Sequence, residues 1–495
     1  MTGLSSALAT AASWQGLVTV VLGTSLGMII GALPGIGPSL GVALLIPFTF
    51  NFDPAISLVF MLCLYQGAEY GGSITAVLIS TPGTAAAACI VQDGYAMNQR
   101  GESGRALGAS LTASSIGGLF SAMVLVILAP FLAEVALSFG PPEYFSLGMF
   151  GLGIVSSLSS DNPLKGWLVA FLGLAIVTVG IDPISGVTRF TGGRFELFEG
   201  VPFMTALIGL FAVAEVFNMI DQSSLRHEVR RRLGSAFLSL RDLRHIMPAT
   251  LRGSVIGAVL GVIPGIGPSV AAWVAYDTER RWSKHPETFG TGEIKGVAAP
   301  EAANNAVVGG SLVPLLSLGI PGSPTAALLM GALVIHGLQP GPQLFVDSPE
   351  IIYAIYAGLG ASIIAMYSLG QIAMPLWMRV VEVPNTILAP VILGLALIGA
   401  YTARNLMFDV WLTLGFGVLG YVLKKYRFPL PPLVLAIVLG YMIESNFRRS
   451  LLMGEGSPMI FMERPLSLVL LVVALVSMCL PLLGNLKRHR ITSTS

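Results

Sequence analysis

Long uncharged apolar stretches alternate with short polar segments along this chain of 495 residues. Asp, Glu, Lys and Arg do not occur in 1–52, 70–92, 302–346 or 465–486. A helix needs about 20 apolar residues to cross the hydrocarbon of a bilayer. The pattern therefore predicts an all-α polytopic membrane protein with membrane segments near 14–32, 39–50 with 55–66, 105–133, 144–160, 164–181, 201–220, 248–264, 295–318, 323–338, 350–378, 385–402, 407–424, 429–445 and 465–486. The shorter pieces fit re-entrant hairpins better than full crossings.

An internal repeat predicts how these segments are organised. The sequence GALPGIGPSL at 31–40 recurs as GVIPGIGPSV at 261–270, with seven of ten residues identical. Two later stretches follow in the same order, because 71–73 is matched by 309–311 and 81–84 by 320–323. We expect two homologous membrane repeats, 1–221 and 247–446, joined by a linker at 222–246 and followed by an extra transmembrane helix and tail at 447–495.

The basic segments predict the orientation of the chain. The linker carries six arginines against two acidic residues, and the tail contains Lys487, Arg488 and Arg490. Cytoplasmic loops are enriched in Lys and Arg, so both segments are expected in the cytoplasm and the uncharged N-terminus outside. Each repeat would then cross the membrane an odd number of times, which makes the repeats inverted.

The repeated Pro-Gly-Ile-Gly-Pro-Ser elements are the first candidate site. Proline interrupts a helix, and irregular backbone at membrane depth survives only where protein or a water-filled cavity satisfies it. Interrupted helices expose N–H groups that suit anions and carbonyls that can ligate Na⁺. The alternative is a kink that only packs helices. The candidate residues are Pro34, Gly35, Gly37, Pro38, Ser39, Pro264, Gly265, Gly267, Pro268 and Ser269.

A second pair of stretches combines small, hydroxyl and amide residues with Pro-Gly breaks, as expected for re-entrant hairpins that hold carboxylates beside a coupling cation. Close helix packing through small residues is the alternative. These candidates are Gly71, Gly72, Ser73, Thr81, Pro82, Gly83, Thr84, Asn304, Asn305, Gly309, Gly310, Ser311, Pro321, Gly322, Ser323 and Thr325.

Two acidic residues, Glu69 and Glu301, head these stretches. A carboxylate at membrane depth is a functional hypothesis by default, so either residue could bind Na⁺ or carry H⁺. Placement in water at the membrane interface is the alternative. Glu215, near the end of the first repeat, is expected at that interface.

Composition excludes several other functions. Only 11% of the residues are charged and the net charge is +1, which argues against a nucleic-acid partner. No GxxxxGK[ST] phosphate loop is present, so we expect no use of ATP. The three cysteines form no CxxC pair, so no firm metal site is predicted. A membrane-embedded enzyme is disfavoured because no HExxH motif occurs and four of the five histidines lie in polar segments. A passive anion channel remains the alternative to a secondary transporter.

The duplicated proline–glycine signature, the Gly-Gly-Ser to Pro-Gly stretch and the length resemble the large transmembrane subunit of the tripartite tricarboxylate transporter family. The resemblance covers nearly the whole chain. It implies about 10 to 14 membrane segments in an elevator-like fold with inverted repeats. It further implies symport of tricarboxylates or dicarboxylates such as citrate across the bacterial inner membrane, driven by a sodium or proton gradient. The implied partners are a small membrane subunit of about four helices and a periplasmic substrate-binding protein. The N-terminus would be periplasmic and the C-terminus cytoplasmic.

Overall fold

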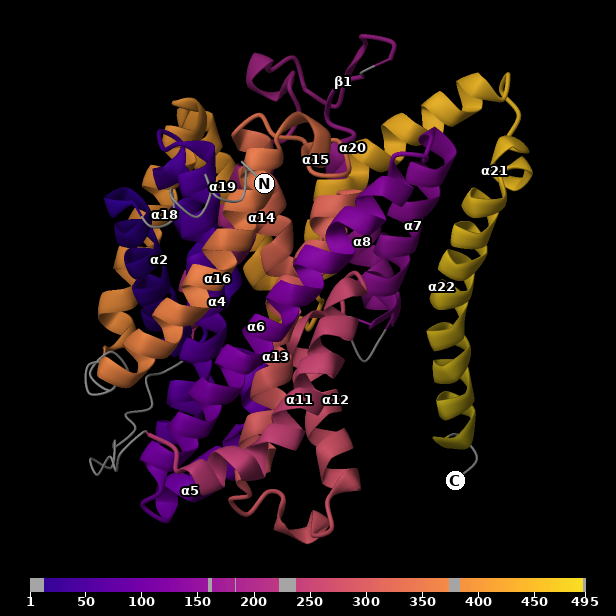
Figure 1. Ribbon diagram of the computed structural model, residues 1–495. Helices are drawn as coiled ribbons and strands as arrows, with labels where there is room; N and C mark the ends of the chain where they lie inside the picture. Colours follow the sequence, from indigo (N-terminus) through magenta and orange to yellow (C-terminus); the bar gives the residue numbers. More distant parts are fainter. Residues whose placement is uncertain (1–12, 159–162, 183, 222–236, 374–382, 493–495) are drawn as a thin grey trace.

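The computed structural model describes residues 13–158, 163–182, 184–221, 237–373 and 383–492, and this part of the chain is almost entirely helical (Figure 1). Its first half contains α2 (Trp14–Ala32), α3 (Gly37–Leu45), η1 (Ile46–Thr49), α4 (Pro54–Ile79), η2 (Ala87–Cys89), α5 (Val91–Gln99), α6 (Ser103–Ala136), α7 (Pro141–Leu158), α8 (Pro163–Val177), the antiparallel strands β1 (Gly180–Ile181) and β2 (Thr188–Arg189), η3 (Phe195–Leu197), α9 (Phe203–Leu207), the π-helical η4 (Ile208–Val213) and α10 (Ala214–Asp221).

The second half contains α11 (Leu240–Val262), α12 (Gly267–Trp282), η5 (Pro286–Thr288), α13 (Ile294–Leu318), α14 (Pro324–Ile335), α15 (Leu344–Asp347), α16 (Pro349–Ile372), α18 (Asn385–Arg404), α19 (Met407–Lys425), α20 (Leu430–Met453), α21 (Ile460–Glu463) and α22 (Pro465–Thr492). Of the predicted linker, 222–236 lies outside the described residues, and α11 already begins within its remainder.

Eight helices of the described part of the chain are long and apolar enough to cross a membrane. The prediction of an all-α, multi-pass membrane protein is therefore confirmed. The segment predicted at 55–66 is longer in the structure, because α4 continues through the Gly-Gly pair to Ile79. Helices α5 and α12 were not predicted, because their polar and charged residues give no apolar segment of helix length.

The helices of the bundle pack in groups, three of which form around α13, α4 and α20 (Figure 1). In the middle, α13 packs against both α6 and α11. On one side α2 packs against α4, which also contacts α16, and on the other α20 packs against α7 and α8. The C-terminal α22 stands at the edge of the bundle against α7, and Ser146 and Ser467 join the two at 2.7 Å.

Both signature elements interrupt their helices as predicted. The chain leaves α2 at Ala32 and re-enters a helix at Gly37, and the corresponding interruption lies between α11 and α12. Gly35 and Gly265 have φ of +86° and +79°. This left-handed region is disfavoured for residues with a Cβ atom, so the glycines fix the position of each break.

Glycines also set how α2 packs on α4 and how α11 packs on α13. A Cβ atom at Gly27 would lie 2.3 Å from the carbonyl oxygen of Leu64, and one at Gly257 would lie 2.2 Å from that of Ala303. Further glycines, one helical turn or more away on α2 and α11, make backbone approaches of the same kind. These are Gly23, Gly31, Gly253 and Gly261. The two helix pairs thus make the close backbone contact of small-xxx-small packing.

Valine at position 27 should destabilise the fold, because its Cβ would overlap the α4 backbone. Overpacking of this kind costs about 3 kcal/mol, and we expect a clear fall in the thermal unfolding midpoint of the purified protein in detergent. Gly394→Val is the matched control, since Gly394 lies in the apolar helix α18 with no atom within 4 Å of its Cβ position. Equal midpoints for the two variants would contradict the packing argument.

The two Pro-Gly breaks bond back to the preceding helix in the same way. The N–H of Gly83 donates to the carbonyl of Gly72 at 3.1 Å, and that of Gly322 donates to Ser311 at 3.3 Å. By these bonds Gly72 corresponds to Ser311, whereas the predicted match of 71–73 with 309–311 pairs Gly72 with Gly310. The two Gly-Gly pairs therefore differ by one residue in their distance from the Pro-Gly break that follows.

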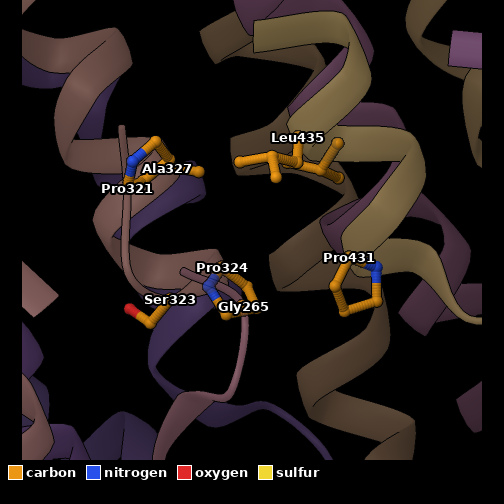
Figure 2. A pocket seen from close by; sticks show the side chains of 8 residues that line it. Gly265, Pro321, Ser323, Pro324, Ala327, Pro431 and Leu435 are labelled. Carbon is orange, nitrogen blue, oxygen red and sulfur yellow. The ribbon is translucent and has the colours of Figure 1, made fainter. Parts of the chain in front are cut away.

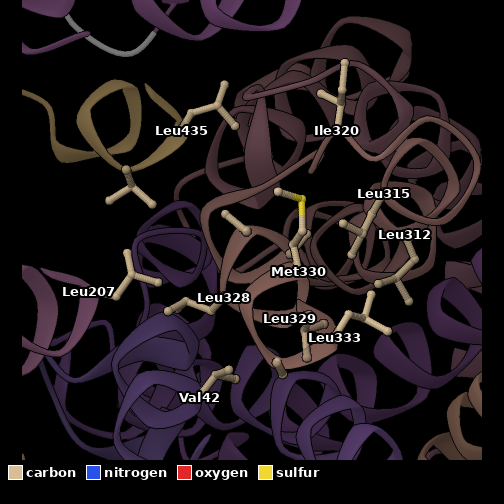
Figure 3. Packing of buried hydrophobic residues seen from close by; sticks show 14 of the residues in the cluster. Val42, Leu207, Leu312, Leu315, Ile320, Leu328, Leu329, Met330, Leu333 and Leu435 are labelled. Atoms are coloured by element: carbon tan, nitrogen blue, oxygen red, sulfur yellow. The ribbon is translucent and has the colours of Figure 1, made fainter. Parts of the chain in front are cut away.

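A short apolar helix, α14, lies inside the protein directly after the second Pro-Gly break. Nine of its twelve residues, from Thr325 to Leu333, are buried. Its leucines pack among side chains of α3, α9, α13 and α20 (Figure 3), including Val42, Leu207, Leu312 and Leu435. Because α14 is enclosed by other helices, protein surrounds the irregular backbone in front of it.

The loop between α8 and α9 is attached to α20. Asp182 accepts hydrogen bonds from the backbone N–H groups of Ser185 and Ile184, each at 2.9 Å, and also binds Arg448. The backbone donors, helped by the guanidinium group, hold the pKa of Asp182 well below its usual range. The carboxylate is therefore charged at neutral pH and ties this loop to the end of α20.

Candidate functional site

The first signature break lines a cavity of about 500 Å³. The walls come from the break itself, from the first Pro-Gly stretch, and from α10, η4, α19 and the start of α20. The lining residues are Gly35, Ile36, Gly37, Pro38, Ser39, Leu40, Pro82, Gly83, Thr84, Ala85, Phe211, Glu215, Lys424, Phe428, Leu430 and Pro431. The volume is that of a small-molecule site.

The second signature break lines a much smaller cavity, of about 10 Å³ (Figure 2). Gly265, Pro321 and Ser323 face α20 across it, and Pro431 of α20 lines both cavities. In Figure 2, Pro431 and Leu435 lie opposite the Pro321–Pro324 segment. The start of α20 therefore lies beside both breaks, and the cavity at the first break is much larger than the cavity at the second.

Hydroxyl groups link the two halves of the chain next to these cavities. Ser39 of α3 and Thr325 of α14 lie 2.9 Å apart, oxygen to oxygen, and Tyr65 of α4 bonds to Ser323 at 3.0 Å. Ser323 in turn donates to Ser311 at 3.5 Å. Neutral donors and acceptors from both halves thus meet where sequence analysis placed the substrate.

One buried ion pair lies on the wall of the larger cavity. Glu215 is 3% exposed and pairs with Lys424, and its Oε1 accepts from Asn218 at 3.0 Å. A Cβ atom at Gly35 would lie 2.9 Å from the same oxygen. Glu215 was expected at the membrane interface, and Lys424 was not considered. The Lys424-Lys425 pair follows an apolar segment, so it reads in sequence as an ordinary basic flank.

A separate polar cluster is buried between α4, α6 and α13. Glu301 accepts from Ser73, from Ser114 at 2.7 Å and from Asn305 at 3.2 Å. Asn305 also accepts from Gln66 at 2.9 Å. Glu301 is fully buried within the protein.

Glu69 lies in the same cluster and is only 1% exposed. The neighbouring Asn304 donates to the backbone carbonyl of Glu69 at 3.2 Å. Within the described residues, both carboxyl oxygens of Glu69 and the side-chain carbonyls of Gln66 and Asn304 accept no hydrogen bond. Four acceptor oxygens of the cluster therefore have no donor within the described residues. Gln66 and Ser114 were not predicted, because neither belongs to a repeated motif or to a helix break.

The other predicted residues support these two regions. Gly71, Gly309 and Gly310 pack against neighbouring helix backbones, and Gly72 packs against Thr84. The remaining ones belong to the four breaks but line neither cavity, and they are Pro34, Thr81, Pro264, Gly267, Pro268, Ser269 and Gly322. The structure thus places some of the predicted residues at the cavities and some in the buried acidic cluster, and the others in neither.

Comparison with known proteins gives the family. Residues 17–435 match the model of the tripartite tricarboxylate transporter TctA family. The chain is 38% identical over 490 residues, 99% of its length and 98% of the relative, to an uncharacterized 52.8 kDa protein in the TAR-I ttuC′ 3′ region of Agrobacterium vitis. It is 37% identical over 221 residues, 45% of its length and 91% of the relative, to a protein in the TAR-II ttuC′ 3′ region of the same organism. No solved structure matches. The chain belongs to the tripartite tricarboxylate transporter TctA family.

Proposed function

We propose that this chain is the large membrane subunit of a secondary active transporter that imports tricarboxylates or dicarboxylates, such as citrate, across the bacterial inner membrane. One observation carries the proposal: a duplicated helix break lines a cavity of about 500 Å³ on one copy and a cavity of about 10 Å³ on the other. Exposed N–H groups at a helix start attract anions, and α3 begins at the wall of the larger cavity.

The buried acidic cluster would hold the coupling ion. Four of its acceptor oxygens, including both of Glu69, have no donor within the described residues, and an uncompensated buried carboxylate is strongly destabilising. Na⁺ bound to these oxygens, or H⁺ on a carboxyl group, would supply the missing positive charge. An inward gradient of that ion would drive symport, without ATP.

The two halves would be inverted repeats that expose the site alternately, with elevator-like movement. The paired breaks and the matching glycine contacts of α2 with α4 and α11 with α13 support this arrangement. The basic linker and tail would lie in the cytoplasm and the N-terminus in the periplasm.

Family membership supports two protein partners. A periplasmic binding protein would deliver the carboxylate, and a small four-helix membrane subunit would complete the complex. The chain and the small subunit would together form the membrane part.

Uptake of radiolabelled citrate into vesicles that contain all three subunits tests the proposal. Uptake should exceed the equilibrium level in a sodium gradient or in a proton gradient, and should stop when that gradient is removed. The rival function, a passive anion channel, predicts flux that follows the citrate gradient alone. Failure to accumulate any tricarboxylate or dicarboxylate under either gradient would refute the proposed function.

A further inference from the structure

The larger cavity contains one cation and one anion among its described lining residues, Lys424 and Glu215. All its other lining residues are apolar or neutral. A cavity that receives a substrate with two or three carboxylates has a single fixed positive charge to offer, and in this structure that charge is paired with Glu215.

The two partners of this ion pair differ in their surroundings. The side chain of Glu215 is 4% exposed and is held by Asn218, whereas that of Lys424 is 41% exposed. Lysine carries three donor hydrogens on a flexible stem. Lys424 can therefore turn toward another acceptor in the cavity, while Glu215 stays in place.

The exchange of partners costs the Lys424 ammonium group little, because water solvates it while it changes partner. The buried carboxylate of Glu215 loses its cation, which opposes the exchange and favours the return of Lys424 when the substrate leaves. A substrate carboxylate offers the same two oxygens as Glu215 does. Other carboxylates of the same molecule could bind to the start of α3 and to the hydroxyls of Ser39 and Thr84, which line the same cavity.

We propose that Lys424 binds a carboxylate of the substrate and that Glu215 holds the Lys424 ammonium group in the cavity until the substrate replaces it. Without that acceptor, a lysine near the end of a membrane helix extends toward the interface. With the substrate bound, the negative charge of Glu215 favours release. The inference rests on the proposed function and names the residue that recognises its substrate.

The test compares Lys424→Met with the matched control Lys425→Met. Lys425 is the next residue of the same helix, contacts Tyr421 and Asp221, and does not line the cavity. Both variants remove one positive charge from the same end of α19. A charge-assisted hydrogen bond to a carboxylate is lost only in Lys424→Met, so we expect its half-saturating citrate concentration to rise about tenfold or more. Lys425→Met should stay within about twofold of the wild type.

Two readouts keep this inference separate from the proposed function. Citrate uptake by the complex measures transport, and the citrate-induced rise in thermal midpoint of the full chain measures binding. If the wild type binds citrate but does not take it up, the transport proposal is refuted. The thermal midpoints of Lys424→Met and Lys425→Met then still test whether Lys424 binds citrate. Equal citrate affinity of Lys424→Met and the wild type, or no citrate response in the wild type, would overturn the inference.

A double variant guards against misfolding. Removal of Lys424 alone leaves Glu215 buried without its cation, which can destabilise the protein. Glu215→Gln with Lys424→Met removes both charges, and the side-chain carbonyl of the new glutamine can still accept from Asn218. This variant should fold and fail to respond to citrate, and a folded double variant that binds citrate with the affinity of the wild type would contradict the proposal.

Discussion

Leucine at position 35 should abolish citrate uptake while the protein still inserts and folds. Gly35 has φ of +86°, and its Cβ position lies 2.9 Å from the carboxylate of Glu215. A leucine would strain the backbone by about 1 to 2 kcal/mol, displace the ion pair and fill part of the cavity. We expect the initial rate of uptake by the complete complex to fall at least about a hundredfold, the scale of misplacement effects in a binding site.

The same change at Gly265 should also stop uptake, for a different reason. Gly265 has φ of +79°, and its N–H donates to the carbonyl oxygen of Gly322 at 3.1 Å. This hydrogen bond connects the two breaks of the second half, and a leucine at position 265 would disturb it. Gly101→Leu is the matched control, because Gly101 has φ of +81° and no atom within 4 Å of its Cβ position. It carries similar backbone strain away from both cavities. Normal uptake in the variants at both 35 and 265 would remove the breaks from the mechanism.

Glutamine at position 301 should uncouple transport from the ion gradient. Its carbonyl oxygen can accept as Glu301 does, and serine hydroxyls can turn to accept from its amide group, so the bonds to Ser73, Ser114 and Asn305 can be replaced. Only the negative charge is lost. We expect initial uptake to fall about tenfold or more and to respond no longer to sodium or protons.

Glu350→Gln provides the control for loss of a carboxylate, since Glu350 is an exposed residue at the start of α16. Uptake is measured with each gradient alone and with none, beside the thermal midpoint of each variant. A well-folded Glu301→Gln protein that keeps the gradient response of the wild type would exclude this cluster as the coupling site.

Much of the fold could be predicted from the sequence, because a helix that crosses lipid needs about 20 apolar residues in a row. Uncharged windows located nearly all the long helices, and the predicted bounds of 14–32 are those of α2 itself. Helix α12 escaped because its C-terminal half carries charged residues. A hydropathy pattern reveals a helix only where most of its residues are apolar.

The candidate site was predictable in its backbone and less so in its side chains. Glycine and proline reveal a break directly, because they act through local conformation. The side-chain contacts are long-range: Lys424 binds Glu215 and Gln66 binds Asn305, each more than two hundred residues away in sequence. The cavity that Lys424 and Glu215 line forms only in the folded chain. An isolated polar residue in an apolar segment gives no sign of which partner it will meet.

The glycine contacts of α2 with α4 and of α11 with α13 have a mechanical consequence. Where backbone touches backbone, no rotamers lie in between to rearrange, and a small slide brings a Cα atom against a carbonyl oxygen. Each pair should therefore travel as one stiff unit. Any reorientation of this protein in the bilayer has to take place at boundaries filled by longer side chains, which can repack as the surfaces shift.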